Sequence, residues 1–453
     1  MSATAFMING FDPAAASRLG PEEQRLIARR RALLGPSYKL FYEHPVQFVR
    51  AEGVRLYDPQ GNAYLDAYNN VPAVGHCHPK VVAAIAEQAA RLNTHTRYLD
   101  EAILAYAEAL LATYPPEIGN VMFTCTGSEA TDLALRVARF HTGGSGIVVT
   151  RNAYHGITSA AAAISPSMGP NVPLGEHVLT IAAPNPYREA GDVAQRFAED
   201  VRAAAAWFAR HGIRFAGLVV DTIFSTDGIL PDPAGALAPA LAAVHEAGGL
   251  FIADEVQPGF GRLGSAMWGF QRHGIVPDIV VMGKPMGNGM PIAGIAARPE
   301  LLDEFGTKVR YFNTFGANSV SIAAARAVLE VIADEGLMAN AAEVGAHLMA
   351  GLRAIARTTP SLGDVRGAGL FVGAEFVDPR TGAPDGRRAL AVVNRLRERR
   401  ILISASGAEG SVLKIRPPLP FSQADADEFL VILAEVVAGL DRENRPKDDA
   451  SPR

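Results

Sequence analysis

The feature of this sequence that most restricts its fold is a series of short apolar runs separated by helical stretches. The runs with the composition of strands are NVMFT (120–124), IVVT (147–150), AGLVVD (216–221), LFIAD (250–254) and DIVVM (278–282). Helical patterns at 193–211 and 236–247 lie between several of them. Continuous apolar runs are typical of strands buried on both faces, and strands that alternate with helices form mainly parallel sheets. The sequence therefore predicts an α/β fold with helices on both faces of the sheet.

Two of these runs lead directly to reactive side chains. LFIAD ends on Asp254, and DIVVM is followed by a glycine and Lys284. Ligands of open α/β sheets bind beyond the carboxyl ends of the strands, so both side chains are expected in one crevice. There a lysine can form a Schiff base with pyridoxal phosphate, and an acid can keep the pyridine nitrogen protonated. An isolated pair of this kind would more often be a structural acid and a solvated lysine, so the hypothesis depends on further motifs.

Composition excludes several other classes of protein. With 49% hydrophobic and 20% charged residues in 453 positions, the chain is an ordinary globular protein long enough for two or three cores. A net charge of −5 gives no basic face for nucleic acid. Two cysteines are too few for a disulfide framework. The N-terminus lacks the pattern of a signal peptide, and no apolar run reaches the ~20 residues of a membrane helix. We therefore expect a cytoplasmic protein without a membrane segment.

The order of patterns predicts two domains and two terminal segments. Residues 1–67 contain a helix and a hairpin, and residues 68–330 hold the alternating strands and helices. Residues 331–440 have the pattern of a smaller α+β domain, and residues 441–453 are a charged tail. The hairpin precedes the large sheet in the chain, so we expect it to pack with the small domain.

Three shorter stretches carry candidate chemistry. TCTGSEA places Gly127 and Ser128 between a strand and a helix, where free backbone N–H groups favour an anion. Tyr154 follows a strand, and its ring is equally suited to cover a planar cofactor or to fill a structural position. The cluster His76-Cys77-His78 lacks the second ligand pair that a metal site requires, so we expect no metal.

Local signals also predict helix positions. Pro79 opens a helix whose apolar residues Val82, Ile85, Ala89 and Leu92 fall at helical spacing. Ser422 and Asp425 resemble a capping box at the start of the last helix, with aspartate in place of glutamate.

Taken together, these motifs resemble the class III, or ω-aminotransferase, family of fold-type I pyridoxal-phosphate enzymes. The resemblance extends from about residue 38 to residue 440 and includes DEVQPGFGRLG, MGKPMGNGMPIAG and TFGANS, the last in place of the family's TFGGNP. It implies a fold-type I transferase with a large pyridoxal-phosphate-binding domain and a small domain. It also implies a homodimer with active sites at the interface, and leaves a tetramer of two such dimers as the alternative.

The resemblance also implies a set of site residues at matching positions. Lys284 would hold the cofactor and carry protons, and Asp254 would pair with the pyridine nitrogen. The cofactor-binding positions are Gly127, Ser128, Tyr154, His155, Asp254, Gln257, Lys284 and Thr314. Thr314 would reach the cofactor phosphate of the neighbouring subunit. The substrate-binding positions are Asn70, Val71 and Arg416.

Within the family, YNNVPAVGHCHP, NTHTRYLDEAI and YFNTFG are most similar to the alanine–glyoxylate aminotransferase 2-like phospho-lyases. Those enzymes eliminate phosphate from O-phosphoethanolamine or phosphohydroxylysine. The sequence departs from the family at Thr226, where members that handle ω-amino acids have a glutamate that pairs with the substrate-binding arginine. Arg416 should therefore remain available for a carboxylate or a phosphate. Two further departures, Ala317 and Ser319, change the loop that carries Thr314.

Three functions remain open from the sequence. An aminotransferase would pass an amino group between an amine or amino acid and a keto acid such as pyruvate or glyoxylate, with Lys284 as the base. A phospho-lyase would use the same residues to eliminate phosphate. We favour the aminotransferase, because most chains with this apparatus transaminate and Arg416 is a ready carboxylate anchor. A non-catalytic scaffold is disfavoured, because such a chain would have no reason to keep Lys284 and Asp254.

Overall fold

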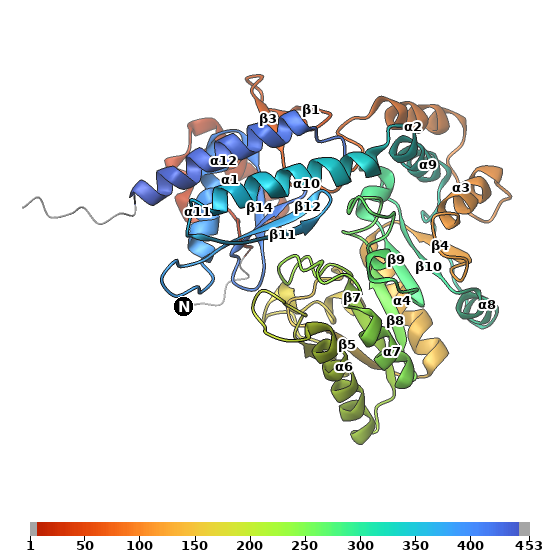
Figure 1. The fold of residues 1–453 in the computed structure, drawn as a ribbon. Coiled ribbons are helices and arrows are strands. Elements are labelled where there is room, and N and C mark those ends of the chain that lie inside the picture. Colours follow the sequence, from red (N-terminus) through yellow and green to blue (C-terminus); the bar gives the residue numbers. More distant parts are fainter. Residues whose placement is uncertain (1–6, 444–453) are drawn as a thin grey trace, which may run out of the picture.

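The computed structural model describes residues 7–443 and is dominated by one seven-stranded sheet (Figure 1). Its strand order is β4-β10-β9-β8-β7-β5-β6. Neighbouring strands are parallel except at β10, which is antiparallel to β4 and β9. The strands are β4 (Asn120–Thr124), β5 (Gly146–Thr150), β6 (Val178–Ile181), β7 (Phe215–Asp221), β8 (Leu250–Asp254), β9 (Ile279–Met282) and β10 (Ala293–Ala297). The predicted α/β class with a mainly parallel sheet is confirmed.

Helices cover both faces of this sheet, because alternate residues of each strand point to opposite sides. On β8, Leu250 and Ile252 pack with one group of helices, whereas Phe251 and Ala253 pack with the other. The first group is α4 (Gly127–Thr142) and α8 (Pro299–Lys308), and the second includes α6 (Val193–Arg210) and α7 (Ala238–Glu246). The apolar runs are continuous in the sequence because both faces of the strands are buried.

Two strands of the sheet were not expected from the sequence. Strand β10 is AGIAA, and alanine and glycine have low strand propensity, so nothing in its composition marks it. Strand β6 is VLTI, whose residues favour a strand, and it lies partly buried at the edge of the sheet. Only β10 is therefore fixed by pairing with its neighbours rather than by local preference.

Three helices pack beside the main sheet, namely α2 (Pro79–Arg91), α3 (Glu101–Leu111) and α9 (Ser319–Asp334). The predicted helix at Pro79 is confirmed, and the apolar residues at helical spacing mark its buried face only in part. Val81 is buried against α9, whereas Val82 is 51% exposed and Leu92, just past the helix, is also exposed. Adjacent valines allow two rotations of the helix, and the apolar spacing alone does not choose between them.

The small domain begins after α9, which runs past the predicted boundary at residue 330. Its antiparallel sheet has the order β11-β12-β15-β14. The strands are β11 (Leu362–Ala368), β12 (Phe371–Phe376), β14 (Ser404–Ser406) and β15 (Val412–Ile415). Figure 1 shows α10 (Leu337–Ala356) and α12 (Gln423–Glu443) side by side over it, with α11 (Gly386–Glu398) nearby.

The predicted capping box at the start of α12 is confirmed. Ser422 N donates to Asp425 Oδ2 over 3.0 Å, and Asp425 N donates back to Ser422 Oγ over 3.2 Å. Helix α12 ends at Glu443, so the first three residues of the predicted tail 441–453 are helical. The remainder of that tail lies outside the described residues.

The N-terminal segment joins the small domain through a second four-stranded sheet, β1-β2-β3-β13, in which β3 runs parallel to β13. The predicted hairpin is formed by β2 and β3 around residues 58–62. The elements are α1 (Pro21–Leu34), β1 (Arg50–Glu52), β2 (Arg55–Tyr57), β3 (Ala63–Asp66) and β13 (Ile401–Leu402). Among the described helices, none has an apolar stretch long enough to span a bilayer.

Candidate active site

A cavity of about 140 Å³ lies at the carboxyl ends of the central strands. Asp221 is the last residue of β7 and Asp254 the last of β8, while Lys284 follows β9 by two residues. The lining residues are Gly127, Ser128, Tyr154, His155, Gly156, Asp221, Asp254, Val256, Gln257 and Lys284. Seven of the eight predicted cofactor positions are therefore brought together in one pocket.

Lys284 presents its amine inside this pocket. The side chain keeps accessible surface, but that surface lies within the cavity and is enclosed by protein. This desolvation, together with the nearby charge of Arg416, lowers the pKa of Lys284 to about 8, against an opposing effect of Asp254. An amine that is partly neutral near physiological pH is suited to attack a carbonyl and to accept a proton.

Asp254 is held by His155. The two side chains are almost fully buried, and His155 Nδ1 lies 2.7 Å from Asp254 Oδ2. The other carboxylate oxygen accepts a hydrogen bond from Val256 N over 3.1 Å. His155 Nε2 is buried without a hydrogen-bond partner among the described residues. The histidine therefore fixes the orientation of the carboxylate toward the pocket.

The N-terminus of α4 forms another side of the pocket. Thr126 caps the helix in a reciprocal box with Glu129, whose carboxylate accepts from Thr126 N over 3.0 Å. The box uses the N–H of Glu129 and leaves those of Gly127 and Ser128 directed at the cavity, where an anion is favoured. Gly156 lies so close that a Cβ there would be 2.6 Å from Ser128 Oγ. The absence of a side chain at Gly156 keeps this corner open.

These features fit pyridoxal phosphate. A partly neutral amine at Lys284 suits its aldehyde, and the free N–H groups of Gly127 and Ser128 suit its phosphate. The anchored carboxylate of Asp254 suits its ring nitrogen, and the unpartnered Nε2 of His155 leaves one more polar atom available to a ligand.

Arg416 lies directly after β15 and reaches the pocket through Gln257, which is one of the residues that line the cavity. It is 4% exposed, so a surface arginine is excluded. Its Nη1 donates to Gln257 Oε1 and its Nε to the carbonyl of Tyr68 over 3.2 Å. Asn70, also buried, donates from Nδ2 to the backbone carbonyl of Gln257 over 3.2 Å. Gln257 thus joins two predicted substrate positions, and its contact with the cofactor ring stays a prediction.

Four predicted site residues are not among those that line the cavity, namely Asn70, Val71, Thr314 and Arg416. Thr314 is exposed on the loop between α8 and α9, beside Phe315, which is 70% exposed. In the same loop Ala317 has a φ of +57°, a left-handed conformation that glycine adopts more easily. Ser319 is the first residue of α9, where the family's proline would also fit.

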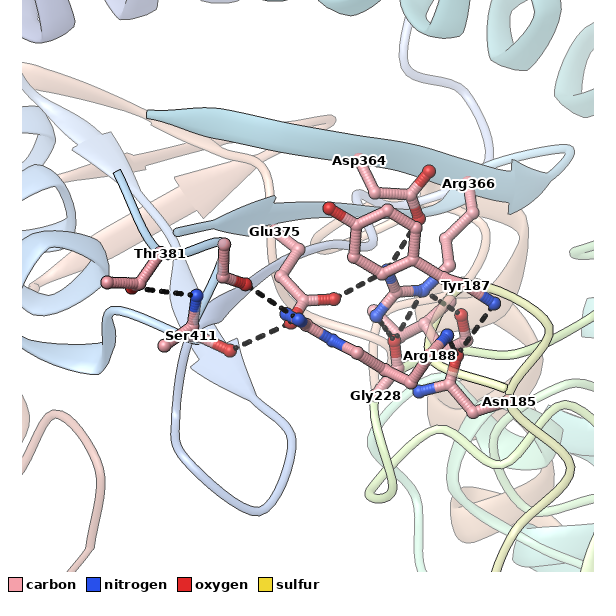
Figure 2. A network of polar contacts seen from close by, with 12 residues as sticks. Asn185, Tyr187, Arg188, Gly228, Asp364, Arg366, Glu375, Thr381 and Ser411 are labelled. Carbon is pink, nitrogen blue, oxygen red and sulfur yellow. Dashed lines mark hydrogen bonds and ion pairs between the residues drawn. The ribbon is translucent and has the colours of Figure 1, made fainter. Parts of the chain in front are cut away.

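The loop after β7 is tied to the small domain. Figure 2 shows Arg366 of β11 between Glu375 of β12 and the carbonyl of Gly228. Arg366 donates to that carbonyl over 2.8 Å and to Glu375 over 2.8 Å, and Arg188 donates to Glu375 as well. The carbonyl of Thr226, in the same loop, accepts from Gly407 N over 3.2 Å. This network fixes the two domains together beside the pocket.

Comparison with known proteins identifies the family. The model of the class-III aminotransferases matches residues 40–437. The chain belongs to the class-III aminotransferase family. An Arabidopsis thaliana protein, alanine–glyoxylate aminotransferase 2 homolog 2, mitochondrial, is 40% identical over 91% of this chain and 87% of its own length. The Caenorhabditis elegans ethanolamine-phosphate phospho-lyase homolog 1 is 34% identical over 98% of this chain and 99% of its own.

Among solved structures, a phospholyase from Arthrobacter in complex with phosphoethanolamine is 42% identical, with a TM-score of 0.89. The match covers 91% of this chain and 99% of that one. The chain is therefore a pyridoxal-phosphate-dependent enzyme of the class-III aminotransferase family.

Two polar residues of this class-III enzyme were not predicted as site residues. Asp221 pairs in register with Asp254 on the neighbouring strand, and burial is the main cause of its raised pKa. Lys414 lies two residues before Arg416 and is buried. The sequence signal for Lys414 was the alternation in VLKIR, which places the lysine and the arginine on the same side of one strand.

Proposed function

We propose that this enzyme is a phospho-lyase that eliminates phosphate from a small phosphorylated amine such as O-phosphoethanolamine. The observation that carries the proposal is Arg416, a buried guanidinium at the edge of the pocket. Within residues 7–443 it forms no ion pair with a carboxylate. The position where ω-amino-acid enzymes of the family have a switching glutamate is Thr226. Arg416 is therefore a permanent anion anchor.

A permanent anchor suits an enzyme whose substrates all carry an anion at the same place. A transaminase that pairs an amine without a carboxylate with a keto acid must accept, at the same position, a carboxylate in one half-reaction and an uncharged group in the other. A lyase binds one substrate and has no such need. The likeness to the Arthrobacter phospholyase and to the Caenorhabditis elegans homolog supports elimination of phosphate over transfer of the amine.

Transamination between an α-amino acid and an α-keto acid is the second candidate. Both partners then carry a carboxylate, which an unswitched arginine can hold in each half-reaction. The likeness to the Arabidopsis thaliana alanine–glyoxylate aminotransferase homolog supports this reading.

The residues of the pocket have the same tasks in either reaction. Bound pyridoxal phosphate supplies an electron sink for the carbon next to the amine. Lys284 accepts the proton from that carbon and can return it. Asp254, oriented by His155, keeps the ring nitrogen protonated, and Gly127 with Ser128 holds the cofactor phosphate. We assign Tyr154 to the ring face and Gln257 to the ring edge.

We further propose a homodimer in which Thr314 serves the partner's cofactor site, since Thr314 and Phe315 are exposed and lie outside their own cavity. Asn70 and Val71 would then lie near the substrate entrance. A reducing compartment such as the cytoplasm is proposed because Cys77 and Cys125 are both free.

The test is incubation of the purified enzyme with O-phosphoethanolamine and no keto acid. The proposal expects equal amounts of inorganic phosphate, ammonia and acetaldehyde, with water consumed. A parallel assay with alanine and glyoxylate measures transamination. Amino-group transfer without any phosphate release would replace the proposed function with the second candidate.

A further inference from the structure

Strand β15 places a second cation beside Arg416. Lys414 is two residues earlier, so both side chains leave the same face of the strand, whereas Leu413 and Ile415 enter the apolar core. Lys414 is 6% exposed. In the part of the chain that the structure describes, its amine makes no hydrogen bond and no ion pair. A buried ammonium group without a partner is rare, because its lost hydration is not replaced.

The two cationic groups lie beside the same aromatic ring, close to the pocket. Lys414 Nζ lies 5.5 Å and Arg416 Cζ 5.4 Å from the centre of the same ring, that of Phe371. The charge of Lys414 also acts on Lys284 and Asp221, which both line the cavity. Lys414 therefore lies close to two residues of the cavity wall, although it is not itself one of the lining residues.

Asp221 does not neutralise this pair of cations. Its carboxylate already accepts from Ser225 Oγ, from Ser225 N over 3.2 Å and from Ile223 N over 3.0 Å. The charge of Asp221 also acts on Lys284 and raises the pKa of that lysine. A lysine that only stabilised the fold at position 414 would be expected to form an ion pair with Asp221. Lys414 forms none within the described residues.

Burial and the nearby charge of Arg416 lower the pKa of Lys414 well below its usual value. An anion that touches both groups would relieve their repulsion and favour the charged form of the lysine. A carboxylate carries one charge and two oxygens, which a bidentate arginine can occupy fully. A phosphate monoester carries a charge of about −1.5 to −2 at neutral pH and three terminal oxygens. It can accept from the guanidinium and the ammonium at once, so the pair matches a dianion better than a carboxylate.

We propose that Lys414 and Arg416 together bind the phosphate group of the substrate, and that Lys414 is the residue that selects a phosphorylated amine over a carboxylated one. This inference rests on the proposed function and names its specificity-determining residue. The backbone holds the pair in place, since Lys414 pairs with Gly373 of β12 and Ser404 of β14. Arg262 supports the end of the strand by donating to the carbonyl of Pro417 over 2.6 Å.

The test compares anion binding by four forms of the holoenzyme: wild type, Lys414→Met, Lys414→Arg and Lys308→Met. The last removes one lysine from an exposed ion pair on α8 and is the matched control. Each is titrated by calorimetry with inorganic phosphate and, separately, with acetate. Lys414→Met should weaken phosphate binding about 10- to 100-fold and change acetate binding little. Lys414→Arg should retain most of the phosphate affinity, and Lys308→Met should match wild type.

A second measurement uses the wild-type protein, in case Lys414→Met does not fold. Acetylation of Lys414 by acetic anhydride is followed by mass spectrometry with and without inorganic phosphate. Phosphate should slow modification of Lys414 and leave that of Lys308 unchanged. Equal labelling of Lys414 at saturating phosphate overturns the inference, as does a Lys414→Met enzyme that binds phosphate like wild type.

The outcomes separate this inference from the proposed function. If wild type binds phosphate through Lys414 but releases none from O-phosphoethanolamine, the phosphate site stands and the proposed function fails. If phosphate is released and Lys414→Met releases it with unchanged kcat/KM, the proposed function stands and the role of Lys414 fails.

Discussion

The two sides of the pocket are built differently. The proposed cofactor side, which comprises Ser128, His155, Asp254 and Lys284, comes from the large domain and mostly follows strands of the mainly parallel seven-stranded sheet. The proposed substrate side comprises Asn70, Lys414 and Arg416. It comes from a loop, from β15 of the antiparallel β11-β12-β15-β14 sheet and from the residue that follows β15. The cofactor side has paired polar groups, such as His155 with Asp254, whereas the substrate side leaves cations without carboxylate partners.

The cofactor side would carry the chemistry that the whole family shares, whereas the substrate side would select the substrate. The cofactor side must provide a base and an electron sink in every reaction of this kind, so its changes should affect all substrates alike. The substrate side makes contact with the group that distinguishes one substrate from another. Changes there should depend on the charge of the substrate.

Replacement of Lys284 by alanine should lower turnover by about 10⁴-fold, because the base and the attachment point of the cofactor are lost together. The loss should be the same for O-phosphoethanolamine and for alanine with glyoxylate, measured as initial rates. Lys308→Ala, on the surface, is the control and should retain full activity. A loss that differs strongly between the two substrates would break the division between the two sides.

Asp254→Asn should keep the cofactor bound and slow the reaction by about 10²- to 10³-fold, because a neutral amide no longer holds the ring nitrogen protonated. Proton abstraction is measured by the exchange of deuterium from the substrate carbon next to the amine. His155→Ala should cause a smaller loss of the same kind, since it removes only the partner that orients Asp254. A near-normal exchange rate in Asp254→Asn would contradict the assignment.

The rate at which the cofactor-free protein captures pyridoxal phosphate should rise with pH. The folded-state pKa of Lys284 is lowered to about 8, so the neutral amine predominates above that value and is protonated below it. Each pH unit below 8 should reduce the reactive fraction about tenfold, and the rate should level off above the pKa. Stopped-flow absorbance of cofactor binding checks this. A flat profile across this range would show that another step limits capture.

Thr314→Ala should weaken retention of the cofactor by about fivefold, which corresponds to about 1 kcal/mol for one hydrogen bond to a charged group. A mixed dimer of Lys284→Ala and Thr314→Ala subunits locates the contact. If Thr314 serves the partner's site, the site that keeps Lys284 also receives an intact Thr314 and should hold the cofactor like wild type. Weak retention at that site would place Thr314 in its own subunit's pocket.

The residues proposed for the cofactor side could be chosen from the sequence because their signals are local, and the structure brings most of them into one pocket. Lys284 and Asp254 each follow a recognisable apolar strand, and the carboxyl ends of parallel strands meet at one edge of a sheet. Gly127 and Ser128 were identifiable from the start of α4, since a helix N-terminus has free donors wherever it lies in the fold. The strand β10 was missed because alanine and glycine give no strand signal.

The substrate side depended on tertiary contacts. Arg416 could be named from its motif, but its burial against Tyr68 and its bond to Gln257 join segments that are far apart in the chain. Alternation along β15 placed Lys414 on the side of Arg416, yet the sequence did not show that this side faces Asp221. A strand's period determines which residues share a face, whereas the packing of the two domains determines what that face meets.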